Sequence, residues 1–165
     1  MRRSVTSIAA AVAILAISAS AAFAAVNWKS GPTVTFNGTS SVTATGDISG
    51  LGNQPAIATL TVEGTVRYTC RNKGGEEAPG QNPVPATGTG SQDLGNSDHN
   101  GRGVLNITVS LDAPPAVVSG KVAGCPNNNW KGINPVSSGI TGATLTVEQA
   151  GSTIFGPSHY DNPNN

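Results

Sequence analysis

TLTVEGTVRYTC, residues 59–70, alternates polar and apolar side chains over its whole length. Every second position falls on one side of an extended chain, because successive side chains of a β-strand point to opposite faces. We therefore predict one long strand with a single buried face. Gly64 in the middle of this run predicts a bulge or bend. The side expected to be buried consists of Leu60, Val62, Gly64, Val66, Tyr68 and Cys70.

The same alternation recurs in LNITVSL (105–111) and ATLTVE (143–148), with shorter candidate strands at 34–36, 42–44 and 117–122. Turn-forming residues separate these runs, and no segment after residue 24 shows a sustained helical period. Strands with one apolar face bury it best by packing as two antiparallel sheets. The predicted fold is all-β: a single-domain antiparallel β-sandwich, immunoglobulin-like in class.

Two segments do not have the strand pattern. Residues 71–101 and 124–139 are rich in glycine, proline and asparagine, which predicts two long loops. Residues 156–165 end in DNPNN and are expected to form a flexible tail, so that the sandwich domain occupies residues 25–155.

The first 24 residues have the three parts of a secretory signal peptide. Arg2 and Arg3 give a positive start, residues 8–19 are apolar, and Ala22 and Ala24 fit a small-residue cleavage site. We expect cleavage after Ala24 and an extracellular, secreted product. No later stretch is apolar enough for an anchor, so no membrane insertion is expected after cleavage.

The chain has two cysteines, Cys70 and Cys125. In an exported protein the expectation is a disulfide between them. A redox or metal pair is the alternative, but it usually needs a C-x-x-C spacing or further ligands. The bridge would bring the starts of the two predicted loops to one end of the sandwich.

Four segments carry a resemblance to a known group of proteins. TCRNKGG (69–75) followed by PGQNP (79–83), then GCPNNNW (124–130) and ATLTVEQ (143–149), resemble an uncharacterised family of small secreted actinobacterial proteins. The likeness covers most of residues 40–150, and its motifs are T-C-x-N-x-G-G and G-C-P-N-x-N-W. The resemblance implies a scaffold built around one bridge and brings no reaction with it.

Charge and catalytic motifs exclude several function classes. Residues 25–165 contain seven basic and nine acidic residues, which gives no overall attraction to nucleic acid or anionic lipid. The two histidines, His99 and His159, lie in the predicted loop and tail, and there is no G-x-S-x-G nucleophile motif. We expect no enzyme activity and no cofactor.

NSDHNG, residues 96–101, has the opening rhythm of a calcium loop. The position for the bidentate acid is Ile107, however, so a polar turn before the next strand is favoured over a metal site. The weak calcium candidates are Asp93, Asn96, Asp98 and Asn100.

The tripeptide NWK occurs twice, at 27–29 and 129–131. Exposed indole rings stack on sugars or anchor protein contacts, and a neighbouring asparagine amide would bond hydroxyl groups. Trp28, Trp130 and Asn129 are therefore candidate ligand contacts. The alternative, which we favour, is that each indole covers part of the core, with Trp130 beside the bridge.

The sequence favours a non-enzymatic extracellular protein that acts as a binding, envelope or matrix module, with a glycan or an extracellular protein as partner. One alternative is a carbohydrate-binding module using exposed Trp. Another is a small hydrolase, or a protease inhibitor that presents an extended loop such as Pro79–Pro85.

Overall fold

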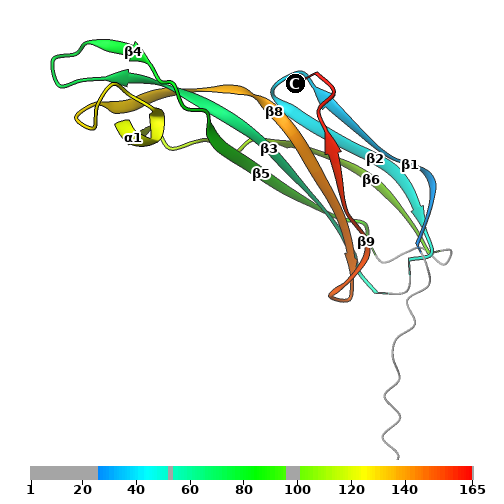
Figure 1. Ribbon diagram of the computed structural model, residues 1–165. Helices are drawn as coiled ribbons and strands as arrows, with labels where there is room; N and C mark the ends of the chain where they lie inside the picture. Colours follow the sequence, from blue (N-terminus) through cyan, green and yellow to red (C-terminus); the bar gives the residue numbers. More distant parts are fainter. Residues whose placement is uncertain (1–25, 52–53, 96–100, 165) are drawn as a thin grey trace, which may run out of the picture.

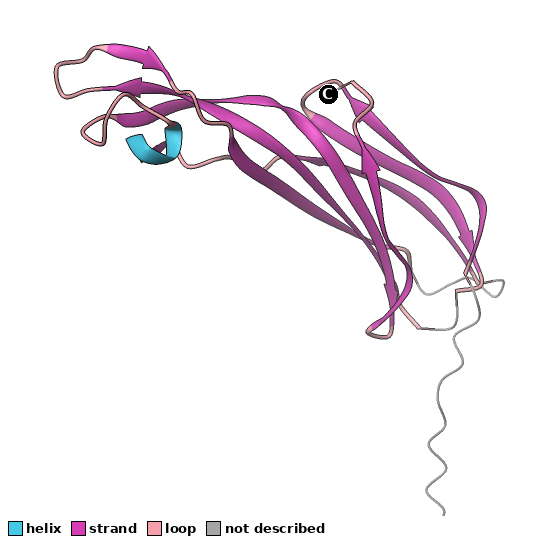
Figure 2. Ribbon diagram, viewed as in Figure 1, coloured by secondary structure: helices cyan, strands magenta, loops and turns pink. Residues whose placement is uncertain are grey.

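The computed structural model describes residues 26–51, 54–95 and 101–164. The chain is almost entirely β-structure, with a single four-residue helix among the described residues (Figure 2). The elements are β1 (Asn27–Asn37), β2 (Ser41–Ser49), β3 (Ala56–Arg71), β4 (Glu77–Pro79), β5 (Val84–Asp93), β6 (Arg102–Ser110), β7 (Val117–Ser119), α1 (Gly120–Ala123), β8 (Lys131–Gln149) and β9 (Ser152–Asp161).

Two antiparallel sheets face one another, which confirms the predicted sandwich (Figure 1). The small sheet has the order β1-β2-β6. The large sheet is built on the long central pair β3 and β8, with β5 beside β3 and β9 beside β8. Further along the same two strands, β4 replaces β5 and β7 replaces β9.

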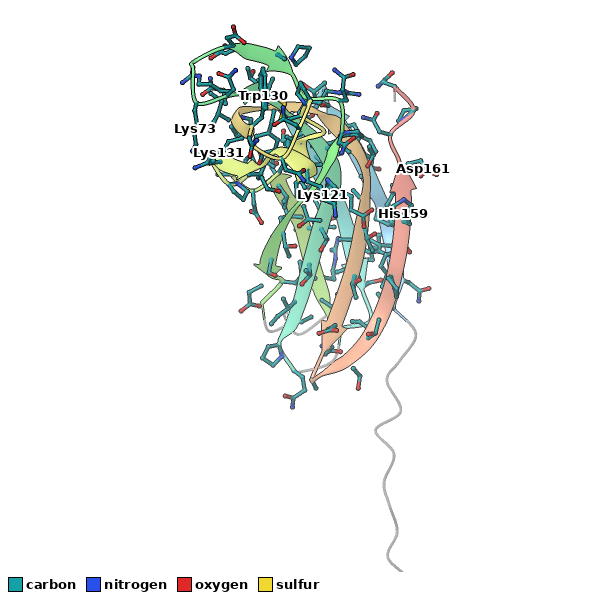
Figure 3. The ribbon with its side chains drawn as sticks, turned by 60° about the vertical axis from the view of Figure 1, so that its left-hand side comes forward. Lys73, Lys121, Trp130, Lys131, His159 and Asp161 are labelled. Atoms are coloured by element: carbon teal, nitrogen blue, oxygen red, sulfur yellow. A yellow bond between two sulfur atoms is a disulfide. The ribbon has the colours of Figure 1, made fainter. Side chains whose placement is uncertain are left out.

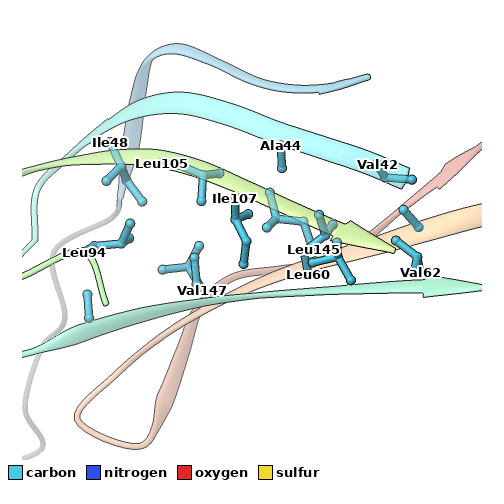
Figure 4. Close-up of a cluster of buried hydrophobic side chains, with 14 of the residues drawn as sticks. Val42, Ala44, Ile48, Leu60, Val62, Leu94, Leu105, Ile107, Leu145 and Val147 are labelled. Atoms are coloured by element: carbon cyan, nitrogen blue, oxygen red, sulfur yellow. The ribbon is translucent and has the colours of Figure 1, made fainter. Parts of the chain in front are cut away.

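The main core lies between the small sheet and the β5-β3-β8-β9 part of the large sheet (Figure 4). In β3 every second residue from Ala56 to Cys70 is buried, as the alternation predicted. Leu60, Leu105 and Leu145 come from three different strands and are almost fully buried together. Each such side chain contributes about 1.5–3 kcal/mol through the apolar surface removed from water.

The bulge predicted at Gly64 is confirmed. The register between β3 and β8 shifts between Glu63 and Gly64. A Cβ at Gly64 would lie 2.5 Å from the carbonyl oxygen of Gly139 and 2.9 Å from Leu111 Cδ1. Glycine is required here because the neighbouring backbone passes where a side chain would stand.

The prediction of one loop over residues 71–101 is wrong, because this segment contains β4 and β5. Strand β5 pairs with β3 over its whole length. Its inward positions include Gly88 and Gly90, so it lacks the apolar alternation that marks a buried face. A Cβ at Gly88 would clash with the Ser110 carbonyl oxygen. The small residues therefore let β5 approach β6, the edge of the other sheet.

Gln92 joins the two sheets along this side. Its side-chain amide donates to the Val104 carbonyl at 3.0 Å, and its side-chain oxygen accepts from the Asn106 N–H at 2.8 Å. Both backbone groups belong to β6, an edge strand of the small sheet. The Gln92 side chain of the large sheet therefore bonds two backbone groups that have no further strand beside them.

Two further expectations need correction near the second predicted loop. Residues 131–139 belong to β8, which pairs with the end of β3 through two register shifts. The segment 117–122 is only partly a strand, because β7 ends at Ser119 and α1 follows. The Ser119 hydroxyl accepts from the Val122 N–H as an N-cap, and Gly124 ends the helix in the left-handed conformation.

The tail expected from residue 156 is also wrong for residues 156–161, which form the second half of β9. Ser158, His159 and Tyr160 pair with Leu145, Thr144 and Ala143 of β8. Gly156 and Pro157 lie at a register shift within this strand.

Candidate functional site

The large sheet continues beyond the end of the small sheet and forms a distal extension, which we define as residues 67–83 and 117–136. It consists of the ends of β3 and β8 with β4, β7 and α1 (Figure 1). The strand rows are aligned across it: Glu77, Arg71, Lys131 and Ser119 lie side by side on four successive strands.

One face of the distal extension is covered by α1 and the connection that follows it. A second, smaller core forms there from Val66, Tyr68, Cys70 and Ala123, with Trp130 and Cys125 packed against it. A Cβ at Gly132 would lie 2.6 Å from the Ala123 Cβ, so the helix rests directly on the strand. The Tyr68 hydroxyl donates to the Pro115 carbonyl at 2.9 Å.

The predicted disulfide between Cys70 and Cys125 is present and links residues 55 positions apart. Cys70 is fully buried at the end of β3. The bridge therefore fixes the connection between α1 and β8 against the end of the central strand.

Residues 79–85, considered for loop display, are not an extended exposed loop. Pro79 belongs to β4, and β5 begins at Val84. Between them, the Gly80 N–H donates to the Tyr68 carbonyl at 2.8 Å and the Asn82 N–H donates to the Ala123 carbonyl at 3.2 Å. The backbone of this segment is thus held against β3 and α1.

Charge is distributed unevenly along the molecule. The distal extension carries five basic and two acidic residues, a formal charge of +3, whereas the other described residues carry two basic and six acidic residues, a formal charge of −4. Figure 3 shows Lys73, Lys121 and Lys131 at the same end as Trp130, away from His159 and Asp161. The basic residues of the extension, all exposed, are Arg67, Arg71, Lys73, Lys121 and Lys131.

A shallow cleft of about 250 Å³ lies on the face of the extension opposite α1. Arg71 and Lys131 are register partners on β3 and β8. Ile133 lies two residues after Lys131, on the same face of β8. The lining residues are Arg71, Asn72, Lys73, Asn129, Lys131 and Ile133. Three cations, two amides and one aliphatic side chain suit an anionic ligand that also has apolar surface.

The cations of this cleft differ in how far they are already neutralised. Arg71 is paired with Glu77, through an Nε–Oε1 hydrogen bond of 2.8 Å and a second contact from the same guanidinium. Asn72 is used to hold the β3–β4 turn, since its side chain bonds both the Glu76 N–H and the Glu76 carboxylate. Among the described residues, Lys73 and Lys131 have no ion-pair partner. These two lysines are the charges available to a ligand.

The structure places the candidate aromatic residues apart. Trp130 is partly buried against the disulfide core, as the packing interpretation predicted, and the neighbouring Asn129 lines the cleft. Trp28 on β1 packs against the main core, edge-to-face with Phe155 at 5.1 Å between ring centroids. Ligand contact by either indole stays a prediction.

His159 lies on the exposed face of β9. Its Nδ1 is 3.1 Å from the Thr144 hydroxyl, and its Nε2 is 3.3 Å from a carboxylate oxygen of Asp161. The two side chains of the ion pair are 49% and 93% exposed. A hydroxyl, an imidazole and a carboxylate are in contact here, on an edge strand of the large sheet.

Three of the four calcium candidates, Asn96, Asp98 and Asn100, lie outside the described residues, as does His99. Asp93 is described, and its carboxylate accepts from the Gly95 N–H at 2.8 Å. Within residues 26–51, 54–95 and 101–164, no group of three or more His, Cys, Asp or Glu side chains could hold a metal ion. In the same ranges no helix is long and apolar enough to cross a membrane.

Comparison with protein-family models, curated proteins and solved structures finds no match to this chain. The resemblance to small secreted actinobacterial proteins therefore stays a prediction. Arg71, Lys73 and Lys131 were not predicted as a group. Arg71 and Lys73 follow Cys70 within the first cysteine motif, and Lys131 follows Trp130 in the second, so the predicted bridge was the signal that could have brought them together.

Proposed function

We propose that this protein is an exported, non-enzymatic binding module whose distal extension binds an anionic extracellular polysaccharide. The observation that carries the proposal is the separation of charge, with +3 on the extension and −4 on the rest of the described chain. A molecule polarised in this way turns its extension toward a polyanion, even though the positive charge of the extension is offset by the negative charge of the other described residues.

The cleft supports the same ligand chemistry at short range. Lys73 and Lys131 offer ammonium groups without an ion-pair partner in the described structure, and the Asn129 side chain lies beside them. Carboxylate and phosphodiester groups both accept charge-assisted hydrogen bonds from such donors. The disulfide and the second core hold the donors on a rigid support, which reduces the entropy lost on binding.

Secretion forms part of this proposal. The N-terminal segment has the order of a signal peptide, and a disulfide is typical of oxidising, extracytoplasmic conditions. The protein for the binding test is therefore to be purified from the culture medium, where we expect its N-terminal residue to be Ala25.

The test is affinity electrophoresis through gels that contain polygalacturonate, poly(glycerol phosphate) or neutral dextran. We expect retardation by one or both polyanions and none by dextran, with the two polyanions distinguishing carboxylate from phosphodiester recognition. Retardation should weaken as salt is raised from about 0.02 to 0.3 M, because exposed charges are screened over about a Debye length.

A matched pair of variants locates the site. Lys131→Glu reverses a charge in the cleft. Lys29→Glu reverses an exposed charge on β1, which belongs to the small sheet and not to the sheet that carries the cleft. We expect Lys131→Glu to weaken polyanion binding about tenfold and Lys29→Glu to change it less than about twofold. Equal effects of the two variants, or no retardation by either polyanion, would contradict the proposal.

A further inference from the structure

The two long sides of the sandwich are built differently. On the β5/β6 side, Gln92 and the bond from the Asp112 N–H to the Thr87 carbonyl join the sheets. On the opposite side, β1 and β9 are the two sheet edges, and no backbone hydrogen bond between them occurs in the described ranges. The Trp28–Phe155 ring pair covers the core near one end of this side.

Near the other end, a groove of about 480 Å³ lies between β1 and the end of the chain. Thr35 and Phe36 line it from β1, and Tyr160, Asp161 and Asn164 line it from β9 and the segment that follows. Figure 1 shows this C-terminal segment beside the turn between β1 and β2. The volume is within the range of about 300–1,000 Å³ that is usual for small-ligand sites.

The groove combines two aromatic rings with polar side chains, among them the Tyr160 hydroxyl and the Asp161 carboxylate, which also pairs with His159. Phe36 and Tyr160 both pack on the main core while lining the groove, so their rings are held in place. The other tyrosine, Tyr68, has a hydrogen-bond partner within the fold, because its hydroxyl donates to the Pro115 carbonyl. The Tyr160 hydroxyl has no hydrogen-bond partner within the described residues, and burial raises the pKa of its phenol above the ordinary value.

A peptide strand does not suit this side of the molecule. The register of β1 shifts between Ser30 and Thr33, and that of β9 shifts at Leu145–Val147 of its partner. Pro32 and Pro157 lie at these points, and proline has no N–H to donate. Neither edge therefore presents the continuous row of backbone groups that an added strand requires.

We propose that the groove between Phe36 and Tyr160 is a second binding site, which accepts a neutral pyranose unit of an oligosaccharide. The apolar face of the sugar ring lies on the two aromatic rings. Its hydroxyl groups bond the Asp161 carboxylate, the Asn164 amide and the Tyr160 and Thr35 hydroxyls. This site is separate from the distal extension and takes an uncharged ligand, so its existence does not depend on polyanion binding.

The test is a titration followed by ¹H–¹⁵N NMR, using the hexaoses of β-1,4-glucose, β-1,4-N-acetylglucosamine, α-1,4-glucose and β-1,4-mannose as probes. We expect at least one probe to shift the amide signals of residues 34–36 and 160–164 in a saturable manner. The signals of residues 71–73 and 129–133 in the extension should stay unchanged. A titration in which no probe shifts the groove signals, or in which all shifts fall in the extension, would overturn the proposal.

Variants separate ring contact from core stability. Tyr160→Leu removes the ring from the groove, and Phe155→Leu removes a ring that packs on the same core but pairs with Trp28 outside the groove. We expect Tyr160→Leu to weaken sugar binding about tenfold and Phe155→Leu to leave it within about twofold.

Asp161→Asn changes a side chain that is 93% exposed, so it tests the polar contact without disturbing the core. We expect Asp161→Asn to weaken sugar binding measurably, and unchanged sugar binding in both Tyr160→Leu and Asp161→Asn would refute the site. Polyanion binding by all three variants should match that of the unaltered protein.

Discussion

Replacing Gln92 tests whether one side chain holds the two sheets together along the β5/β6 side. Gln92→Ala removes a donor to the Val104 carbonyl and an acceptor for the Asn106 N–H. Each intramolecular hydrogen bond contributes a net of about 1 kcal/mol, so we expect a loss of about 2 kcal/mol in the free energy of unfolding. The side chain is only partly buried, and water can reach the freed groups, which keeps the cost from rising further.

Gln92→Glu separates the two bonds. At neutral pH its carboxylate accepts from Asn106 but has no hydrogen for the Val104 carbonyl, so we expect this variant to be no more stable than Gln92→Ala. The facing carbonyl disfavours the charged carboxylate and raises its pKa in the folded state above the unfolded value of about 4.3. Protonation then supplies the missing donor, so the variant should gain stability relative to Gln92→Ala at low pH and lose that gain as pH rises through the folded pKa.

The assay is equilibrium unfolding in urea, followed by the fluorescence of Trp28 and Trp130, with the disulfide intact. Trp28 packs on the main core and therefore reports on the sandwich itself. The refuting result for the Gln92 argument is a loss below about 0.5 kcal/mol for Gln92→Ala with an unchanged urea slope, because the two bonds would then contribute nothing net.

Two further predictions concern the distal extension. The double substitution Cys70→Ala with Cys125→Ala should lower the free energy of unfolding by about 4 kcal/mol, because the bridge links residues 55 positions apart. Thiol titration of the unaltered native protein should find no free thiol. A loss of less than about 1 kcal/mol in the double variant would contradict this prediction. Trp130→Ala should lower the free energy of unfolding in urea by about 2 kcal/mol. This is less than the roughly 3–5 kcal/mol typical of a fully buried ring, because the indole is partly exposed. An unchanged urea midpoint would show that the indole does not support the disulfide core.

The sandwich could be predicted from the strands whose inward positions carry large apolar side chains. Residues 59–70 fit this rule at every second position, and even their bulge was marked by Gly64. Strand β5 escaped prediction because Gly88 and Gly90 on its inner face serve close approach to β6 rather than apolar burial. The helix α1 spans only four residues, which is too short to show a helical period.

The candidate site was harder to predict than the fold. The bridge between Cys70 and Cys125 follows from export and cysteine count alone. The cationic cleft depends on which residues become neighbours across the sheet. Lys131 becomes the register partner of Arg71 because β8 begins at Lys131, twelve residues before the apolar run ATLTVE (143–148) that predicted this strand. That early part of β8 reads KGINPVSSG, in which glycine, proline and serine hide the strand.

The ladder between β3 and β8 sets the order in which this chain can fold. Ala56 pairs with Gln149 and Arg71 pairs with Lys131, so each contact closes a loop of roughly 60 to 90 residues before it contributes any stability. The β1–β2 and β8–β9 hairpins can form locally and early, but the centre of the large sheet has to wait until the last third of the chain is available. Two cysteines allow no wrong intramolecular pairing, so oxidation involves no reshuffling. The rate of reaching the native state should therefore be governed by this single long-range docking step.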